Sequence, residues 1–178
     1  MKIINNKLEN DLNLRSEKDF PKKGINFIDI TPLIINKEVF KEIIDKFIIE
    51  LNNKEVDYIV APEARGFIFG AAIASELKIG LIPVRKIGKL PPSTVETSFD
   101  YQKEYGKDIL ELPKLVNENY KGKKFYIIDD IYATGNTINA IKQAIKELGG
   151  DIIGCGVIIN IIELNDDKNV YSLIDVNE

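Results

Sequence analysis

Hydrophobic and polar positions follow two different spacings along this chain. The stretch 37–53 repeats its apolar side chains every three to four residues, which predicts an amphipathic helix. The stretches 66–80 and 138–150 read as further helices, and both end at glycines, which suit helix C-termini. The apolar positions of the first helix are Val39, Phe40, Ile43, Ile44, Phe47, Ile48 and Leu51.

Short apolar runs lie between the predicted helices and predict buried strands. These runs span 57–62, 81–84, 124–130, 151–162 and 171–176. Because strands and helices alternate through most of the chain, we expect one α/β domain over residues 1–178, with a mainly parallel sheet and helices on both faces. Ligands of such sheets bind at the C-terminal ends of the strands.

The segment from about residue 86 to residue 112 breaks this alternation. It contains glycine, two adjacent prolines, many polar residues and three aromatic residues. It is too long and irregular for an ordinary connection, although its second half is compatible with a hairpin. Long loops inside compact domains are often functional, so we expect a flexible lid here.

Composition limits the classes of partner. The chain of 178 residues is 44% hydrophobic and 29% charged, which is typical of a globular domain. Its net charge of -4 and the lack of a basic stripe argue against nucleic acid as a partner. No segment reaches the roughly 18 apolar residues of a membrane span, and the N-terminus is too polar for a signal peptide. We therefore predict a cytoplasmic protein without a membrane partner.

Two residue counts restrict the chemistry. The single cysteine, Cys155, lies in an apolar stretch, so we interpret it as a core residue of a protein in a reducing compartment. The chain has no histidine, which excludes Ser-His-Asp and Cys-His catalysis. Catalysis must therefore use carboxylates, Lys, Arg, Tyr, backbone amides or a hard cation.

The stretch "IIDDIYATGNT", residues 127–137, places two carboxylates and a small loop between a strand and a helix. Asp129 and Asp130 at the strand end can accept hydrogen bonds from the hydroxyls of a sugar. The first turn of the helix offers unpaired amides, Gly135 allows a tight backbone, and Thr134 and Thr137 add hydroxyls. This combination indicates a ribose 5-phosphate; the alternative is a surface turn in which Thr137 caps the helix.

Two other phosphate-binding motifs do not fit this sequence. A Walker loop requires G-x-x-x-x-G-K-[ST], and the loop lacks both the first glycine and the lysine. A dinucleotide fingerprint requires G-x-G-x-x-G, and the G-x-G at Gly154 and Gly156 lies inside an apolar strand without the third glycine.

Beyond these physical arguments, "FYIIDDIYATGNT" resembles the phosphoribosyl diphosphate (PRPP) signature of the purine and pyrimidine phosphoribosyltransferases. The wider chain is similar to the adenine phosphoribosyltransferases. The matching motifs occur in the family's order: "DFPKKGINFIDITPL", "EARGFIFG", "RKIGKLP" and "EYG". The resemblance implies the type I phosphoribosyltransferase fold, with a small N-terminal hood over about residues 1–32 and a lid loop over about residues 86–112.

The resemblance also implies a role for individual residues. The 5-phosphate would be held by Ala133, Thr134, Gly135, Asn136 and Thr137, and the ribose would face Asp129 and Asp130. The residues implied for pyrophosphate are Arg65, Lys86, Lys89 and Tyr105. Phe27 would stack on adenine while the backbone of Ile25 reads the edge of the base, and Glu104, or else Asp129, would handle the proton of the base.

Each of these residues also has a structural alternative. Arg65 could pair with Glu63 on the surface, Phe27 could be plain core, and Lys86 and Lys89 could simply face solvent.

The implied reaction joins adenine and PRPP to give AMP and pyrophosphate, through a transition state that resembles an oxocarbenium ion. Mg²⁺ would be the cofactor, bound mainly through PRPP rather than by direct protein ligands. The family also implies a homodimer. Two alternatives stay open: transfer to a 6-oxopurine such as hypoxanthine or xanthine, and a non-catalytic PRPP- or nucleotide-sensing regulator with the same fold.

Three positions depart from the family pattern. Ile28 stands where the family usually has Arg, beside the expected base pocket. Asn136 replaces the second glycine of the phosphate loop, and Pro62 stands where a flexible or aliphatic residue is usual. Ile28 bears on recognition of the base, whereas Asn136 tolerates the backbone of the loop better than most residues do.

Overall fold

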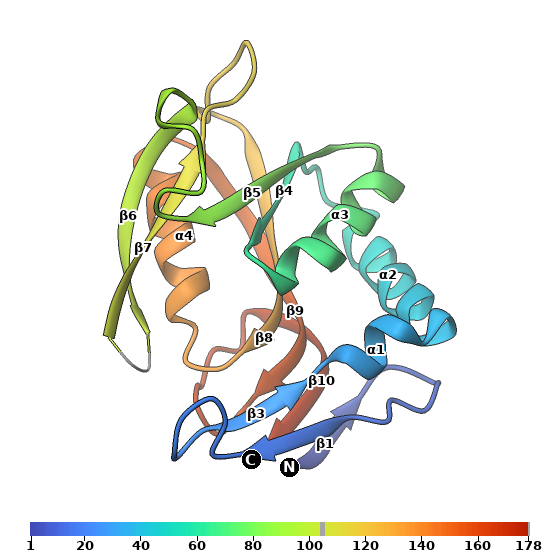
Figure 1. The fold of residues 1–178 in the computed structure, drawn as a ribbon. Helices are drawn as coiled ribbons and strands as arrows, with labels where there is room; N and C mark the ends of the chain where they lie inside the picture. Colours follow the sequence, from blue (N-terminus) through green and yellow to red (C-terminus); the bar gives the residue numbers. More distant parts are fainter. Residues whose placement is uncertain (104–105, 178) are drawn as a thin grey trace.

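A central twisted sheet organises the protein (Figure 1). The computed structural model describes residues 1–103 and 106–177, and the side chains of residues 1–101 and 108–177. In sheet order, the described strands are β1 (Lys2–Asn6), β10 (Val170–Asn177), β9 (Asp151–Ile161), β8 (Lys124–Tyr132), β4 (Tyr58–Pro62), β5 (Gly80–Lys86), β7 (Gly106–Pro113) and β6 (Val95–Lys103).

The middle of the sheet is parallel and its two edges are antiparallel. Strands β10, β9, β8, β4 and β5 pair in parallel with their neighbours. Strand β1 pairs antiparallel with β10 at one edge, and β7 and β6 continue antiparallel from β5 at the other. The predicted α/β fold with a mainly parallel sheet is confirmed, and the C-terminal ends of the parallel strands lie along one edge.

Helices cover both faces of the sheet. Helices α2 (Lys37–Leu51) and α3 (Arg65–Leu77) lie on one side and α4 (Asn136–Glu147) on the other (Figure 1). Strand β8 serves both cores, because Tyr126 and Ile128 pack with α2 and α3 whereas Phe125 and Ile127 pack with α4. This alternation explains why the strand reads as a continuous apolar run.

Helix α2 confirms the strongest periodic signal of the sequence. Asn36 caps it, since its side-chain oxygen accepts hydrogen bonds from the amides of Glu38 and Val39 at 3.1 and 3.2 Å. The expected apolar stripe faces the core, and Phe47 is completely buried. Phe47 packs directly on β9, where a Cβ added to Gly156 would lie 2.5 Å from the Phe47 ring.

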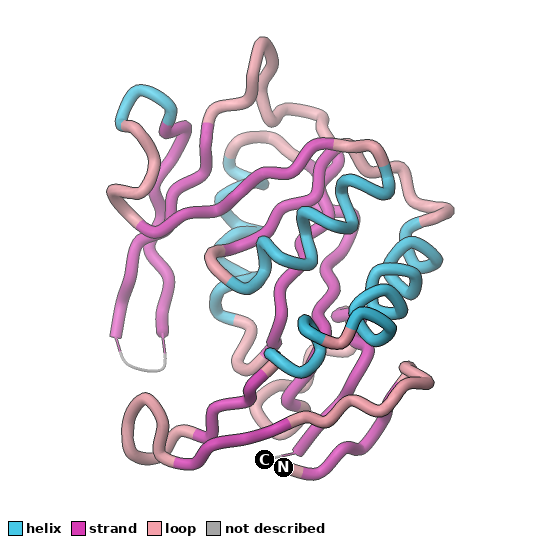
Figure 2. Tube along the Cα trace, turned by 45° about the vertical axis from the view of Figure 1, so that its right-hand side comes forward, coloured by secondary structure: helices cyan, strands magenta, loops and turns pink. Residues whose placement is uncertain are grey.

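The N-terminal segment divides into two parts. Strand β1 joins the main sheet, whereas β2 (Arg15–Lys18) and β3 (Asn26–Asp29) form a separate antiparallel pair, which we call the hood. A short helix, α1 (Thr31–Ile35), connects the hood to α2. Figure 2 shows the hood strands lying apart from the main sheet.

Residues 86–112 are more regular than the sequence suggested. The 3₁₀ helix η1 (Pro92–Thr94) leads into a long hairpin of β6 and β7, and β7 pairs with β5 through Arg85 opposite Glu111. In both views this hairpin extends from the side of the sheet opposite α2 (Figures 1 and 2). The hairpin expected in the second half of the segment is confirmed, and β6 begins earlier, at Val95.

Two further predictions concern the burial of Cys155 and the absence of a membrane span. Cys155 is buried in the core beneath α4, as predicted. Among the described helices, none is long and apolar enough to cross a membrane.

The packing of Phe47 on Gly156 yields a stability prediction. Phe47→Ala should lower the free energy of unfolding by about 3–5 kcal/mol, because it leaves a cavity against β9. Ile49→Ala on the same helix should change it by less than about 0.5 kcal/mol, since Ile49 is 71% exposed. Urea unfolding of both variants measures the difference, and similar losses would contradict this account of the core.

Candidate functional site

A cavity of about 490 Å³ lies between the hood and the C-terminal ends of the parallel strands. Four separate segments line it. Residues 24–28 come from the hood, and Arg65 comes from α3. The rest are Ile131, Ala133 and Thr134 around the end of β8, with Ile161 and Leu164 at and after the end of β9. This location is where ligands of parallel α/β sheets bind. Ile25, Phe27, Arg65, Ala133 and Thr134, all predicted from sequence, are therefore brought to one cavity.

The loop after β8, residues 133–137, runs from the strand directly into α4. Gly135 precedes the helix with φ of 77°, a left-handed conformation that glycine adopts without cost. Space also demands glycine, because an added Cβ would lie 2.2 Å from the hydroxyl of Tyr132. In the described part of the chain, the first turn of α4 has no side-chain cap, so its amides are free of such a partner, and helix starts of this kind can bind anions.

Two buried carboxyl groups precede the loop. Asp129 and Asp130 are 9% and 5% exposed, and Oδ1 of Asp129 accepts a hydrogen bond of 2.9 Å from the amide of Asp130. Burial, and next the negative charge of Asp130, raise the pKa of Asp129 well above its ordinary value. The site therefore contains one carboxyl that resists ionisation in the absence of a ligand.

The start of α3 approaches this acidic pair closely. A Cβ added to Gly66 would lie 3.0 Å from Oδ1 of Asp129 and 3.0 Å from the ring of Pro62. Glycine at this position thus lets the first turn of α3, with its unpaired amides, pack against the end of β8.

Arg65 connects three parts of the site. Its Nε lies 2.6 Å from Oδ2 of Asp130, and its Nη1 lies 3.5 Å from the carbonyl oxygen of Ile28. Its guanidinium carbon lies 5.3 Å from the ring centre of Phe27, within cation–π range. The suggested pairing of Arg65 with Glu63 is wrong, because Glu63 pairs with Arg85, whose Nε lies 2.5 Å away.

The hood presents its open backbone edge to the cavity. The Ile25 amide donates to the carbonyl of Lys22 at 3.2 Å and its carbonyl accepts from Phe20 at 3.3 Å, so both groups are engaged within the hood turn. The Ile28 carbonyl instead faces Arg65, away from β2. Because backbone groups alternate between the two edges of a strand, Asn26 and Ile28 share the edge toward the cavity. Asn26 was not predicted from the sequence, and Ile28 was considered there only for its side chain.

Comparison with known proteins identifies the family of this chain. The phosphoribosyl transferase domain matches residues 33–177. The adenine phosphoribosyltransferase of Clostridium acetobutylicum is 45% identical over 163 residues, which cover 89% of this chain and 92% of the relative. The chain belongs to the adenine phosphoribosyltransferase family.

Solved structures of other family members share the fold. The enzyme of Thermoanaerobacter pseudethanolicus superposes with a TM-score of 0.83 at 39% identity, covering 92% of this chain and 95% of that one. The Saccharomyces cerevisiae enzyme, solved with an imino-altritol bisphosphate and adenine, gives a TM-score of 0.81 at 34% identity, covering 91% and 94%. The type I phosphoribosyltransferase fold expected from the motifs is confirmed.

The structure accounts for the departures of this phosphoribosyltransferase from the family pattern. Ile28 is 2% exposed, so its side chain is buried in the core, and Arg65 places a cation beside the cavity. Asn136 is the first residue of α4 and has a right-handed helical backbone, so this position does not require glycine. Pro62 ends β4 in a buried position and is followed by a cis peptide between Glu63 and Ala64.

Several predicted residues of this phosphoribosyltransferase lie outside the cavity lining. Lys86 ends β5 and Lys89 follows in a turn, and both side chains are exposed at the strand ends. Thr137 lies in the first turn of α4. Glu104 and Tyr105 lie outside the described residues.

Two apolar residues of the lining were not predicted. Ile161 and Leu164 complete the cavity from the end of β9. Ile161 falls at the end of the strand predicted over 151–162, whereas Leu164 lies beyond it, in a stretch to which the sequence analysis assigned no element.

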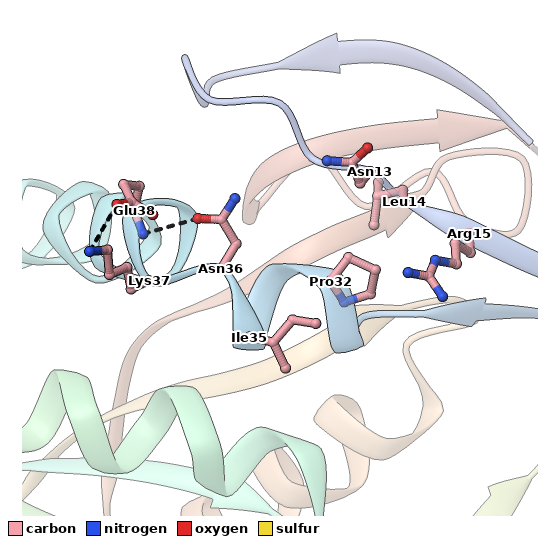
Figure 3. A pocket seen from close by; sticks show the side chains of 8 residues that line it. All are labelled: Asn13, Leu14, Arg15, Pro32, Ile35, Asn36, Lys37 and Glu38. Carbon is pink, nitrogen blue, oxygen red and sulfur yellow. Dashed lines mark hydrogen bonds and ion pairs between the residues drawn. The ribbon is translucent and has the colours of Figure 1, made fainter.

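A second cavity of about 760 Å³ lies beside α1 and the start of α2 (Figure 3). Asn36 and Lys37 line it, but Asn36 already serves as the cap of α2, and Lys37 lies 3.5 Å from Glu38 in an exposed ion pair. Within the part of the chain that the structure describes, no predicted site residue lines this cavity, so the first cavity is the candidate active site.

The raised pKa of Asp129 predicts how the unliganded fold depends on pH. A carboxyl with a higher pKa in the folded state takes up protons on folding, so its contribution to stability falls as pH rises from the unfolded-state pKa of about 3.9 through the folded-state pKa. Asp129→Asn should therefore raise the melting temperature at pH 8 by roughly 3 °C or more.

The advantage of the Asp129→Asn variant should vanish near pH 4, where Asp129 of the wild-type protein is protonated in the folded state. Thermal unfolding of both proteins from pH 4 to pH 8 measures this convergence. An Asn variant that is less stable than the wild type at pH 8 would show that the buried charge is compensated.

Proposed function

We propose that this protein transfers the 5-phosphoribosyl group from PRPP to adenine, giving AMP and pyrophosphate. The observation that supports the proposal is that Ala133 and Thr134 of the loop after β8 line the same cavity as the hood edge, with Arg65 between them. Family relatives named adenine phosphoribosyltransferase support it, and the yeast member was solved with adenine bound.

The donor would be held along the end of β8. Amides of residues 133–137 and the start of α4 suit the 5-phosphate, because they can donate hydrogen bonds to an anion although the loop has no basic side chain. Asp129 and Asp130 would accept hydrogen bonds from the ribose hydroxyls. Arg65, with Lys86, Lys89 and Tyr105 of the lid segment, would bind the diphosphate, for which a guanidinium fork is well matched.

The base would be read by backbone groups. Phe27 offers one apolar face and Ile131 and Leu164 offer others, which suits a flat purine. Carbonyl and amide groups of Asn26 and Ile28 on the open hood edge are complementary to the 6-amino donor and the N1 acceptor of adenine. A 6-oxopurine presents the opposite pattern, with an acceptor at position 6 and a donor at N1, and would leave the hood groups unpaired.

The transition state would develop positive charge on the sugar and negative charge on the leaving diphosphate. Arg65 and the unpaired amides of α3 would stabilise the leaving group, and the fixed positions of sugar and base would supply orientation. The N9 proton of adenine must be removed, and Glu104 or Asp129 would receive it. The raised pKa of Asp129 makes its ionised form a stronger base.

Mg²⁺ fits this donor set as a cofactor. The described residues contain no cluster of three or more ligating side chains, but the acidic pair supplies carboxylate oxygens beside the proposed diphosphate site. Mg²⁺ commonly binds through one or two carboxylates and substrate phosphates. When bound through PRPP, it would neutralise charge on the leaving group. We further propose a cytoplasmic homodimer with one phosphoribosyltransferase domain per chain.

The acceptor base can be tested directly. With PRPP and Mg²⁺, the protein should release pyrophosphate in the presence of adenine, and at least roughly 100-fold more slowly with hypoxanthine, guanine or xanthine. Parallel assays of the four bases measure this preference. Comparable rates with a 6-oxopurine would reject the adenine assignment, whereas PRPP binding without turnover of any base would indicate a sensor.

The donor site can be tested by replacing both carboxylates. Asp129→Asn with Asp130→Asn should abolish detectable PRPP binding, because the ribose hydroxyls lose charged acceptors and Arg65 loses its partner. Calorimetric titration with PRPP and Mg²⁺ gives the affinity, and circular dichroism checks the fold. A folded double variant with wild-type affinity would rule out the ribose role.

A further inference from the structure

The connection between β9 and β10, residues 162–169, contacts the phosphate loop through Asn165. The Nδ2 atom of Asn165 lies 2.9 Å from the carbonyl oxygen of Ala133, the first residue of the loop. The same Nδ2 lies 3.0 Å from Oδ1 of Asn160 and 3.0 Å from the carbonyl oxygen of Ile161, both on β9. Asn165 therefore ties the loop to the neighbouring strand.

The contact with Ala133 controls more than one carbonyl group. In a planar trans peptide, the carbonyl of Ala133 and the amide of Thr134 point in opposite directions. Holding the carbonyl against Asn165 therefore aims the Thr134 amide away from Asn165. A loop without a basic side chain depends on such aimed amides to hold an anion.

A second contact holds the other side of the loop. The hydroxyl of Tyr132 donates a hydrogen bond of 3.0 Å to Oδ2 of Asp167. The Tyr132 hydroxyl also occupies the space beneath Gly135, where an added Cβ would approach within 2.2 Å. Asn165 and Asp167 are themselves linked, since Oδ1 of Asn165 accepts from the amide of Asp167 at 3.2 Å. The β9–β10 connection therefore contacts Tyr132 and Ala133, the two residues at the start of the loop.

We propose that Asn165 is a positioning residue for the 5-phosphate, acting on the phosphate loop through the carbonyl of Ala133, with Tyr132 and Asp167 as a second support. The inference rests on the proposed function only in taking residues 133–137 as the 5-phosphate site. Leu164, directly before Asn165, lines the base side of the same cavity. The connection therefore supports the phosphate loop and the base pocket together.

Comparison of AMP with adenosine isolates the phosphate contribution, since the two ligands differ only in the 5-phosphate. Asn165→Leu removes the donor without adding charge and keeps a similar side-chain size. The variant should bind AMP roughly 10-fold more weakly, while its affinity for adenosine should change by less than about twofold. In steady-state assays, the KM for PRPP should rise while the KM for adenine stays unchanged.

The same substitution at an exposed position provides the control. Asn53→Leu, in the turn after α2, should leave both ligand affinities at the wild-type level. Equal losses of AMP and adenosine affinity in Asn165→Leu would show a merely structural role and overturn the inference. Unchanged AMP affinity in that variant would overturn it as well.

A milder variant keeps the test decisive if Asn165→Leu does not fold. Tyr132→Phe removes the hydroxyl that contacts Asp167 and keeps the ring beneath Gly135. It should weaken AMP binding roughly threefold without affecting adenosine, and equal effects on the two ligands would again overturn the inference.

The wild-type protein separates failure of this inference from failure of the proposed function. A wild-type protein that binds AMP no more tightly than adenosine would overturn the phosphate site itself, and with it the role of Asn165. A wild-type protein that prefers AMP but forms none from adenine and PRPP would instead reject the proposed reaction, while the AMP and adenosine titrations of the Asn165 variant would still decide the inference.

Discussion

The ion pair between Arg65 and Asp130 is the contact on which the arrangement of the site depends. It joins the start of α3 to the end of β8, and the further contacts of Arg65 with Phe27 and Ile28 extend the connection to the hood. A carboxylate as buried as Asp130 would be costly without a cation beside it. The close approach that permits the pair requires Gly66, since any side chain there would press on Asp129.

This arrangement gives two neighbouring aspartates different characters. Asp130 shares its charge with Arg65, whereas Asp129 accepts a hydrogen bond from a backbone amide and has a raised pKa because of burial and the charge of Asp130. Asp129 therefore resists carrying a charge. Hydroxyls of a ligand would donate hydrogen bonds to the aspartates, whereas a diphosphate at Arg65 would compete with Asp130 for the guanidinium.

The sequence predicted the parts of the fold whose side-chain pattern is set by burial. Helix α2 and strands β8 and β9 are apolar because both cores need them, and their patterns are visible without a structure. Strands β1 and β2 were missed because all of their side chains are exposed, so only backbone pairing defines them. The alternation in "VETSFDY" does indicate β6, but the prolines and glycines before it pointed to a loop.

Parts of the candidate site that lie in one short stretch of sequence could be predicted, whereas parts that depend on the pairing of strands could not. The order of strand, acidic pair, small loop and helix predicted residues 129–137 as a phosphoribosyl site, and of these residues Ala133 and Thr134 line the candidate cavity. The role of Ile28 could not be judged in this way, because the pairing of β2 with β3 decides which face of the strand is buried. Asn165 lies in a polar run, "NDD", that looks like an ordinary surface turn.

In the proposed function, backbone groups would recognise both the base and the 5-phosphate, and this explains how the chain can tolerate its unusual residues. The outward edge of β3 offers main-chain groups, whose hydrogen-bonding pattern does not change when a side chain is replaced. An isoleucine at position 28 can therefore fill the core, while the backbone keeps its orientation toward the cavity. The proposed phosphate loop, residues 133–137, would work by the same principle, because its backbone amides would be the donors. Its amides must be held in place from outside, and the β9–β10 connection lies where that support is needed.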